Sequence, residues 1–221
     1  MCGRFTLNIN ELALEERFNS KNSASVLPIF NALPTQFLPV ISIENHSTID
    51  LMRWGMPFEI NNSLKNIINT RKESILEKQK FKKLISTQRC LVLADSFIEW
   101  DKNFYKQPYR IMLSDNSCFA FAGIYDKYLI KNMQINCFSI ITTKANSLVG
   151  KIHSRMPVIL NRNIENEWIN KNISHNEAIQ MLCSFPAEQM IMHPISKNIN
   201  DVNSNNPNNL IPIEINKSLF D

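Results

Sequence analysis

The chain has 221 residues, of which 44% are hydrophobic and 20% charged, a composition that allows a substantial buried core. No apolar run approaches the roughly 18 to 20 residues that cross a bilayer, and nothing near the amino terminus resembles a secretory signal, so we expect a soluble cytoplasmic protein without membrane contact. The net charge of +4 permits nucleic-acid binding without requiring it.

Hydrophobic periodicity predicts the elements along the chain, because helices repeat their apolar residues every three to four positions and strands alternate them. In chain order we expect a helix over 10–18, strands over 37–43 and 49–54, a helix over 73–85, strands over 89–94, 96–100, 109–113, 118–125 and 135–142, helices over 164–172 and 175–183, and a strand over 190–195. The Asn-rich stretch 198–209 is predicted to be a loop, after which apolar 210–215 docks back.

Strands dominate the middle of the chain, and no repeat or break in composition divides it. Helices are interspersed without a regular βαβ rhythm, which favours an α+β fold over 1–221, a single domain built on a curved, largely antiparallel sheet. Only four glycines are present, and no Gly-rich loop that could cradle a phosphate occurs, so nucleotide-driven chemistry is not expected.

The five cysteines are odd in number and widely spaced, and no two of them lie two residues apart. A disulfide framework or a cysteine zinc site is therefore not expected, and we predict neither a metal nor a cofactor. Four cysteines lie in apolar segments and are interpreted as reduced core residues. Cys2 is the exception, because packing does not explain its position.

Cys2 follows the initiator methionine and precedes Gly3. Removal of Met1 would expose a 1,2-aminothiol, whose amine has a reference pKa of roughly 7.7 to 8.0. Such a group condenses with an aldehyde: the amine forms a Schiff base, and the sulfur closes a five-membered thiazolidine. Acyl transfer with the terminal amine as base is an alternative, and so is a cysteine that stands at position two by chance.

Two further segments carry candidate polar groups. Asn69 and Arg71 begin a basic helical stretch, where they could bind a phosphate or sugar, or where Asn69 could simply cap the helix. Glu99 precedes Trp100 in an apolar strand. If it points inward, its surroundings suit it to proton transfer, and if it points outward it is a solvated strand residue.

The remaining candidates lie in turns. His153 precedes Arg155 by two residues at the entrance to a strand, and histidine is the natural acid–base group near neutral pH, although surface loop histidines are common. Arg53 and Trp54 end a strand before a turn. Trp54 could stack against a base while Arg53 holds a phosphate, or it could be a buried tryptophan at a strand end.

Together and in this order, these segments resemble the SRAP family (SOS-response-associated peptidases), understood as abasic-site DNA–protein crosslinkers. The resemblance spans essentially the whole chain and implies that the curved sheet forms a barrel-like core with peripheral helices. It is carried by Met1-Cys2-Gly3-Arg4-Phe5, Asn31-Ala-Leu-Pro34-Thr35-Gln36, Arg53-Trp54-Gly55, Asn69-x-Arg71-x-Glu73, Arg89-Cys90-Leu91, Glu99-Trp100, His153-x-Arg155-Met156-Pro157, His193-Pro194, Asn203 and Pro207.

The resemblance implies covalent capture of abasic sites in single-stranded DNA during the DNA damage (SOS) response, with self-processing peptidase (hydrolase) and lyase-like activities. It implies that Cys2 is the crosslinking nucleophile and that Asn69 positions the terminal amine and the opened sugar. Glu99 is then expected to transfer protons near the amine, and His153 to act on the sugar oxygens. A monomer is expected, associated with the nucleoid if the protein is bacterial.

The resemblance also implies a DNA-binding surface. Arg4, Arg71 and Arg155 are expected to hold phosphates around the lesion. Pro34 and Trp54 are expected on the same surface, where Trp54 and its turn bound the DNA channel. The turn after Trp54 is one residue shorter than the family's Trp-Gly-Leu-Ile-Pro, which leaves a preference for DNA junctions open.

Three other activities stay open. Glutamine amidotransferases also begin Met-Cys-Gly, but the glycine-rich motifs of such amino-terminal-nucleophile amidohydrolases are missing here. A peptidase that acts on other proteins is the second alternative, and a non-catalytic reader of single-stranded DNA is the third. The reader would bind equally well without Cys2.

Overall fold

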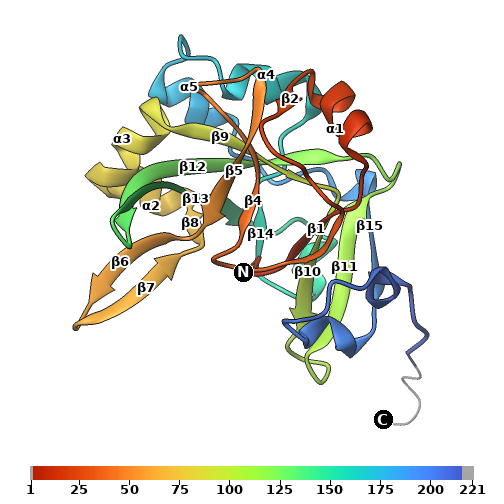
Figure 1. Cartoon of the computed structure of the whole chain (residues 1–221). Helices are drawn as coiled ribbons and strands as arrows, with labels where there is room; N and C mark the ends of the chain where they lie inside the picture. Colours follow the sequence, from red (N-terminus) through yellow and green to blue (C-terminus); the bar gives the residue numbers. More distant parts are fainter. Residues whose placement is uncertain (1, 216–221) are drawn as a thin grey trace.

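Two sheets make up most of the fold in a computed structural model, which describes residues 2–215 (Figure 1). The larger sheet follows the order β14 (Arg155–Pro157), β13 (Met133–Lys144), β12 (Phe119–Ile130), β9 (Arg89–Ala94), β4 (Phe37–Ser42), β5 (Thr48–Trp54) and β2 (Lys21–Asn22), and β8 (Asn69–Arg71) also pairs with β13. The second sheet follows the order β15 (Met190–Pro194), β11 (Gln107–Leu113), β10 (Ser96–Asp101), β1 (Phe5–Leu7) and β3 (Ile29–Ala32).

The larger sheet closes on itself. β13 pairs with β5 in parallel, with Cys137 opposite Arg53 and Phe138 opposite Trp54. This pairing joins the two ends of the antiparallel run β13–β12–β9–β4–β5 and makes a five-stranded barrel. Closure leaves these strands without a free edge. The predicted α+β fold with a curved, barrel-like, largely antiparallel core is confirmed.

Short helices surround the sheets (Figure 1). They are α1 (Glu11–Phe18), α2 (Lys72–Glu77), α3 (Gln79–Thr87), α4 (Glu165–Trp168), α5 (His175–Gln180) and the 3-10 turns Val149–Lys151, Arg162–Ile164, Ala187–Gln189, Lys197–Asn200 and Pro207–Leu210. Asn10 caps α1 by accepting a hydrogen bond from the backbone N–H of Ala13. Within residues 2–215, no helix combines the length and apolarity needed to cross a membrane.

Several predicted bounds are corrected by the structure. The helix predicted over 73–85 is two helices, because Lys78 adopts an extended backbone (φ −99°, ψ 120°) between them. The helix predicted over 164–172 is shorter, with a 3-10 turn followed by α4 alone. The predicted docking of 210–215 is supported by Leu210, which is buried, and by the bridge between Ile195 and Pro212. Met1 and residues 216–221, the ends of the predicted 1–221 domain, lie outside the described residues.

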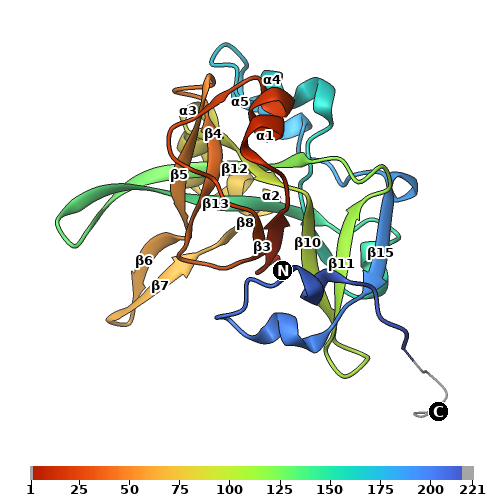
Figure 2. The same ribbon diagram turned by 45° about the vertical axis from the view of Figure 1, so that its right-hand side comes forward.

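Other elements were not predicted. Besides the short strands β1, β2, β3, β8 and β14, the structure contains a two-stranded hairpin of β6 (Met56–Ile60) and β7 (Ser63–Ile67). Its turn residues, Asn61 and Asn62, both have positive φ (49° and 56°), which asparagine tolerates better than most residues. The hairpin projects from the barrel in Figures 1 and 2.

Arg89 holds the outer helices on the barrel. Its side chain is completely buried at the start of β9, and its guanidinium donates hydrogen bonds to the carbonyl oxygens of Ile85 and Ser86 in α3 and of Trp168 and Asn170 around α4. Burial lowers the pKa of this guanidinium. One cation therefore satisfies the carbonyl groups at the ends of two helices, which would otherwise be buried without donors.

Replacement of Arg89 by methionine is expected to lower the free energy of unfolding by about 3 kcal/mol, because it leaves several buried carbonyls without donors. Urea denaturation followed by circular dichroism measures this change. Arg162→Met, at an exposed position, is the matched control and should change the stability little. Equal stability of the two variants would contradict this assignment.

Candidate active site

The amino-terminal segment enters the molecule between two strands. β1 pairs with β10 on one side, with Phe5 opposite Phe97, and with β3 on the other, with Phe5 opposite Ala32. The amino-terminal end consequently lies beside β3 and β10 (Figure 2). Cys2 precedes β1 and is completely buried, and its Sγ lies 3.5 Å from the carbonyl oxygen of Arg4, to which it donates.

A buried polar network fixes β1 against β10. Arg110 Nη2 lies 2.9 Å from Asp95 Oδ2, and this ion pair is largely buried. Thr6 Oγ1 donates to the other oxygen of Asp95 and lies against the hydroxyl of Ser96. Because Thr6 is in β1 and Ser96 in β10, the network sets the position of the amino-terminal segment relative to β10.

Asn69 contacts Cys2 directly. It lies in β8, which pairs in parallel with β13, so that Asn69 is opposite Ile140. Asn69 Nδ2 donates to the carbonyl oxygen of Cys2 at 2.7 Å. Its Oδ1 is buried and accepts no hydrogen bond from any residue among 2–215. The amide therefore anchors the Cys2 backbone and keeps an acceptor for a further donor.

Glu99 is the carboxylate whose negative charge affects the pKa of the Cys2 thiol. It lies in β10 and is 3% exposed, so the inward orientation is the one that the structure shows. Trp100 points to the opposite face of the strand, where it packs with Ile98 and the carboxy-terminal segment. Burial, and next the negative charge of Glu99, raise the pKa of the Cys2 thiol well above its ordinary value. The thiol is consequently protonated at neutral pH.

This protonation predicts an order of reactivity among the cysteines. Cys183 is exposed, so its interpretation as a core residue is wrong. Because the thiolate is the nucleophile, iodoacetamide at pH 7.5 is expected to modify Cys183 at least about tenfold faster than Cys2. Peptide mass spectrometry of timed samples measures both rates. In urea the two rates should converge, and a Cys2 that reacts as fast as Cys183 in the folded protein would contradict the assigned environment.

His153 lies between the turn Val149–Lys151 and β14. It is half-buried, and its Nδ1 lies 3.0 Å from both the backbone nitrogen and the carbonyl oxygen of Arg155. The backbone N–H of His153 donates to the carbonyl of Val149, which fixes the turn that presents the ring.

Arg155 is paired with a carboxylate. Its Nη1 and Nη2 lie 2.8 and 2.9 Å from the two oxygens of Glu73, and Nη2 also donates to the carbonyl of Thr142 at 2.7 Å. The hydrogen bond from Arg155 lowers the pKa of Glu73. Thr142 in β13 lies opposite both Arg71 in β8 and Pro157 in β14, so this strand brings the Asn69 and His153 segments together.

Arg4 and Pro34 lie near the amino-terminal segment. Arg4 is half-buried, and its Nη1 donates to Asn31 Oδ1 at 3.3 Å. The Nδ2 of Asn31 in turn donates to carbonyl oxygens in the 199–204 segment. Pro34 is half-buried in the turn before β4, and Thr35 after it has a positive φ of 75°.

The structure corrects the expected place of Trp54 on the DNA-binding surface. It is completely buried, its ring centroid is 5.0 Å from that of Phe5, and it stacks on Phe138 at 6.3 Å. Its Nε1 donates to the carbonyl of Ile68. The interpretation as a buried tryptophan at a strand end is the one observed, because a side chain with no exposed surface cannot bound a DNA channel.

The structure brings some of the predicted residues together and leaves others apart. Asn69 is hydrogen-bonded to Cys2, and the charge of Glu99 acts on the Cys2 thiol. Arg155 pairs with Glu73, and Arg71 nearby is exposed. Sequence reasoning assigned no role to two partners, Glu73 and Asn31. Both belong to motifs that were recognised, and their positions within those motifs were the only signal.

Comparisons with known proteins show which family this chain resembles in sequence and fold. A sequence profile described as SOS response associated peptidase (SRAP) matches residues 1–202. Abasic site processing protein YoqW of Bacillus subtilis is 36% identical over 219 residues, which cover 94% of this chain and 97% of YoqW. Abasic site processing protein HMCES of Gallus gallus is 30% identical over 85% of this chain and 67% of its own length. A crystal structure of a Bacteroides thetaiotaomicron protein superimposes with a TM-score of 0.85 at 26% identity, covering 96% of this chain and all of that one. The chain belongs to the SRAP family.

Proposed function

We propose that this protein processes abasic sites and that it does so by forming a covalent bond between the abasic sugar and Cys2 once Met1 is removed. Family membership and the names of YoqW and HMCES support abasic-site processing. The observation that carries the covalent step is the contact of the Asn69 amide with the Cys2 backbone beside the buried carboxylate of Glu99.

The proposed reaction has two bond-forming steps. The terminal amine of Cys2 attacks the aldehyde of the ring-opened sugar, and loss of one water gives an imine. The Cys2 sulfur then adds to the imine carbon, and the thiol proton goes to the nitrogen. The product is a thiazolidine, and one molecule of water is released overall. An internal cysteine lacks the adjacent amine and cannot complete this ring.

The environment of Cys2 supports this order of steps. Its thiol is protonated because burial and Glu99 raise its pKa, whereas a terminal amine has a reference pKa of roughly 7.7 to 8.0 and is partly neutral. The amine is therefore the first nucleophile. Glu99 accepts a proton from the amine as the carbinolamine forms and returns it to the leaving hydroxyl. It then relays the thiol proton to the nitrogen as the sulfur attacks. Asn69 holds the Cys2 backbone in place during both steps.

The remaining residues are assigned to the sugar and the phosphates. His153 is proposed to donate a proton to a sugar oxygen during ring opening. Arg4, Arg71 and Arg155 are proposed to contact phosphates, and Pro34 to line the DNA path. Phosphate contacts do not depend on sequence, so binding of single-stranded DNA should weaken as salt is raised.

Several finer activities remain predictions. These are a role in the SOS response, self-removal of Met1, lyase-like cleavage, a monomeric state and a cytoplasmic, nucleoid-associated location.

A denaturing gel tests the proposal. Purified protein, with loss of Met1 checked by mass spectrometry, is incubated with a single-stranded oligonucleotide that contains one abasic site. A heat-stable shifted band is expected, whose mass is that of protein plus oligonucleotide minus one water. The same oligonucleotide with an intact base should give no band. Reversible binding without an adduct would replace the covalent proposal with the non-catalytic reader.

A further inference from the structure

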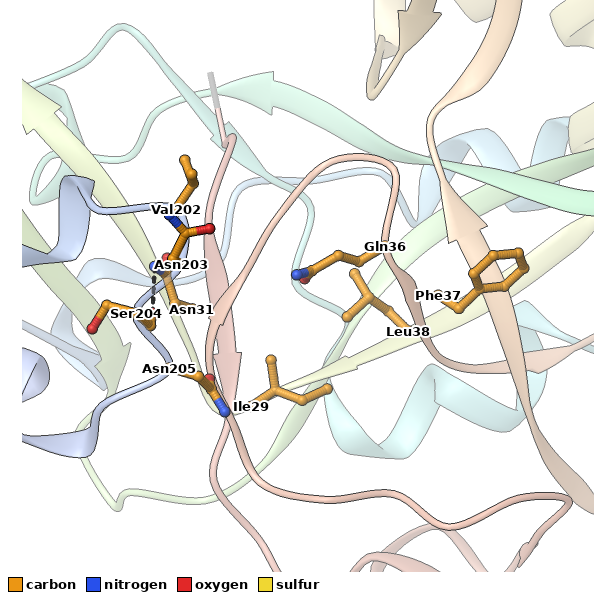
Figure 3. Close-up of a pocket in the computed structure, with 9 residues that line it drawn as sticks. All are labelled: Ile29, Asn31, Gln36, Phe37, Leu38, Val202, Asn203, Ser204 and Asn205. Atoms are coloured by element: carbon orange, nitrogen blue, oxygen red, sulfur yellow. Dashed lines mark hydrogen bonds between the residues drawn. The ribbon is translucent and has the colours of Figure 1, made fainter.

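A cavity lies beside the amino-terminal segment, between β3, the start of β4 and the carboxy-terminal segment 202–205 (Figure 3). Its volume is about 430 Å³. The lining residues are uncharged without exception: Ile29, Asn31, Gln36, Phe37, Leu38, Val202, Asn203, Ser204 and Asn205. A ligand that fits this lining is neutral, with apolar surface and groups that form hydrogen bonds, since a phosphate or carboxylate would find no cation on these walls.

One wall connects the cavity to Cys2. Asn31 lines it and accepts a hydrogen bond from Arg4, which is two residues from Cys2. The Nδ2 of Asn31 donates to the carbonyls of Asp201 and Ser204 at 3.0 and 2.9 Å. Asn31 therefore fixes the 202–205 segment against β3, so that this wall is already formed next to the proposed reacting residue.

Gln36 provides an oriented donor. Its Oε1 accepts a hydrogen bond from the backbone N–H of Leu33 at 2.9 Å, which determines which end of the amide is oxygen. The side chain extends across the cavity towards Asn31 and Asn203 (Figure 3). Among residues 2–215 no acceptor for its Nε2 is found, so this donor is available to a ligand.

Apolar side chains accompany this donor. Leu38 in β4 points to the same side as Gln36, which directly precedes the strand, whereas Phe37 points away, as alternation along a strand requires (Figure 3). Ile29 approaches from β3. A flat molecule between Ile29 and Leu38 would contact apolar groups on its faces and the Gln36 amide at its edge. A nucleobase has this combination of apolar faces and an edge with acceptors.

We propose that this cavity receives the nucleobase adjacent to the abasic site in the captured strand. The inference rests on the proposed function, because the abasic sugar is then held at Cys2 and the neighbouring nucleotide passes Arg4. The cavity distinguishes the flanking base from the lesion, which has no base to bind. The abasic sugar is thereby positioned through the base of the neighbouring nucleotide.

Oligonucleotides that lack one flanking base test the assignment. The abasic site is placed between two normal nucleotides, or next to a tetrahydrofuran spacer on its 5′ or its 3′ side. The concentration of oligonucleotide at half-maximal adduct formation is measured. With the wild-type protein, removal of the base on one side is expected to raise this concentration about tenfold, as loss of one stacked base does. Removal on the other side should change it little.

Two variants at Gln36 test whether its amide contacts the flanking base. Gln36→Ala removes the amide, and Gln36→Glu keeps the acceptor for Leu33 while it removes the donor. Both variants should raise the half-maximal concentration for the oligonucleotide in which both neighbouring nucleotides keep their bases. Replacing a neighbouring nucleotide by the spacer should not raise this concentration further in either variant. Gln134→Ala, an exposed glutamine remote from the lining residues, is the control and should behave like the wild type.

The outcomes separate this inference from the proposed function. Adduct formation that depends neither on a flanking base nor on Gln36 would overturn the cavity assignment and leave the covalent function intact. If the wild type forms no adduct, fluorescence anisotropy with an unreactive tetrahydrofuran oligonucleotide measures the same base dependence without chemistry. A tenfold loss that is specific for one side would then support the cavity although the covalent function had failed, and equal affinities would reject it.

Discussion

Replacement of Cys2 by serine is expected to abolish the heat-stable adduct with abasic single-stranded DNA. The variant keeps the terminal amine and can still form an imine, but a serine hydroxyl is a poorer nucleophile than sulfur and does not give a comparably stable ring. The imine then hydrolyses when the sample is heated. A denaturing gel should show the shifted band for the wild type and none for Cys2→Ser.

Cyanoborohydride separates the two steps of this reaction. If it is added during incubation, it reduces the imine to a stable amine, and Cys2→Ser should recover a shifted band. Cys183→Ser, which alters an exposed cysteine, should crosslink as the wild type does. A heat-stable adduct in Cys2→Ser or Cys2→Ala without reductant would refute ring closure by the Cys2 sulfur.

Glu99→Gln is expected to slow adduct formation by about 10² to 10⁴-fold, the usual contribution of a positioned acid–base group. The substitution keeps the size and shape of the side chain and removes its charge. The final yield should reach that of the wild type, because the product itself does not require the carboxylate. Single-turnover gels over a time course measure the rate, and thermal unfolding checks that the fold is unchanged.

An opposite effect on alkylation distinguishes catalysis from structural damage. The negative charge of Glu99 raises the pKa of the Cys2 thiol, so its removal lowers that pKa and increases the thiolate fraction. Iodoacetamide should consequently modify Cys2 faster in Glu99→Gln than in the wild type, while crosslinking becomes slower. If both rates change in the same direction, Glu99 acts on the accessibility of Cys2 and not on proton transfer.

The barrel was predictable because its strands are long and apolar. β9 has the predicted bounds 89–94. β12 (119–130) continues beyond the carboxy end of the predicted strand 118–125, and β13 (133–144) extends the predicted strand 135–142 at both ends. β1 and β8 escaped prediction because each has three residues, too few for a period, and because their pairing partners are distant in sequence. Such strands are determined by tertiary pairing, which periodicity does not report.

The candidate site was predictable as a set of residues and not as a geometry. The motifs contain Cys2, Asn69 and Glu99, but the hydrogen bond from Asn69 to Cys2 joins positions 67 residues apart. Similarly, nothing local indicates that Arg155 pairs with Glu73, 82 residues away. Trp54 shows the limit most clearly, because an aromatic side chain at a strand end fits a surface wedge and a core equally well until its neighbours are known.

The enclosure of Cys2 has a consequence for the durability of the protein. Oxidants attack the thiolate, and thiols that are both buried and protonated lose electrons slowly to peroxide. Oxidising conditions are also those that damage DNA. A sulfur kept as S–H in the interior would survive such an episode without becoming sulfenic acid, whereas the exposed Cys183 would be modified first. The protein would thus keep the thiol that the proposed ring closure requires.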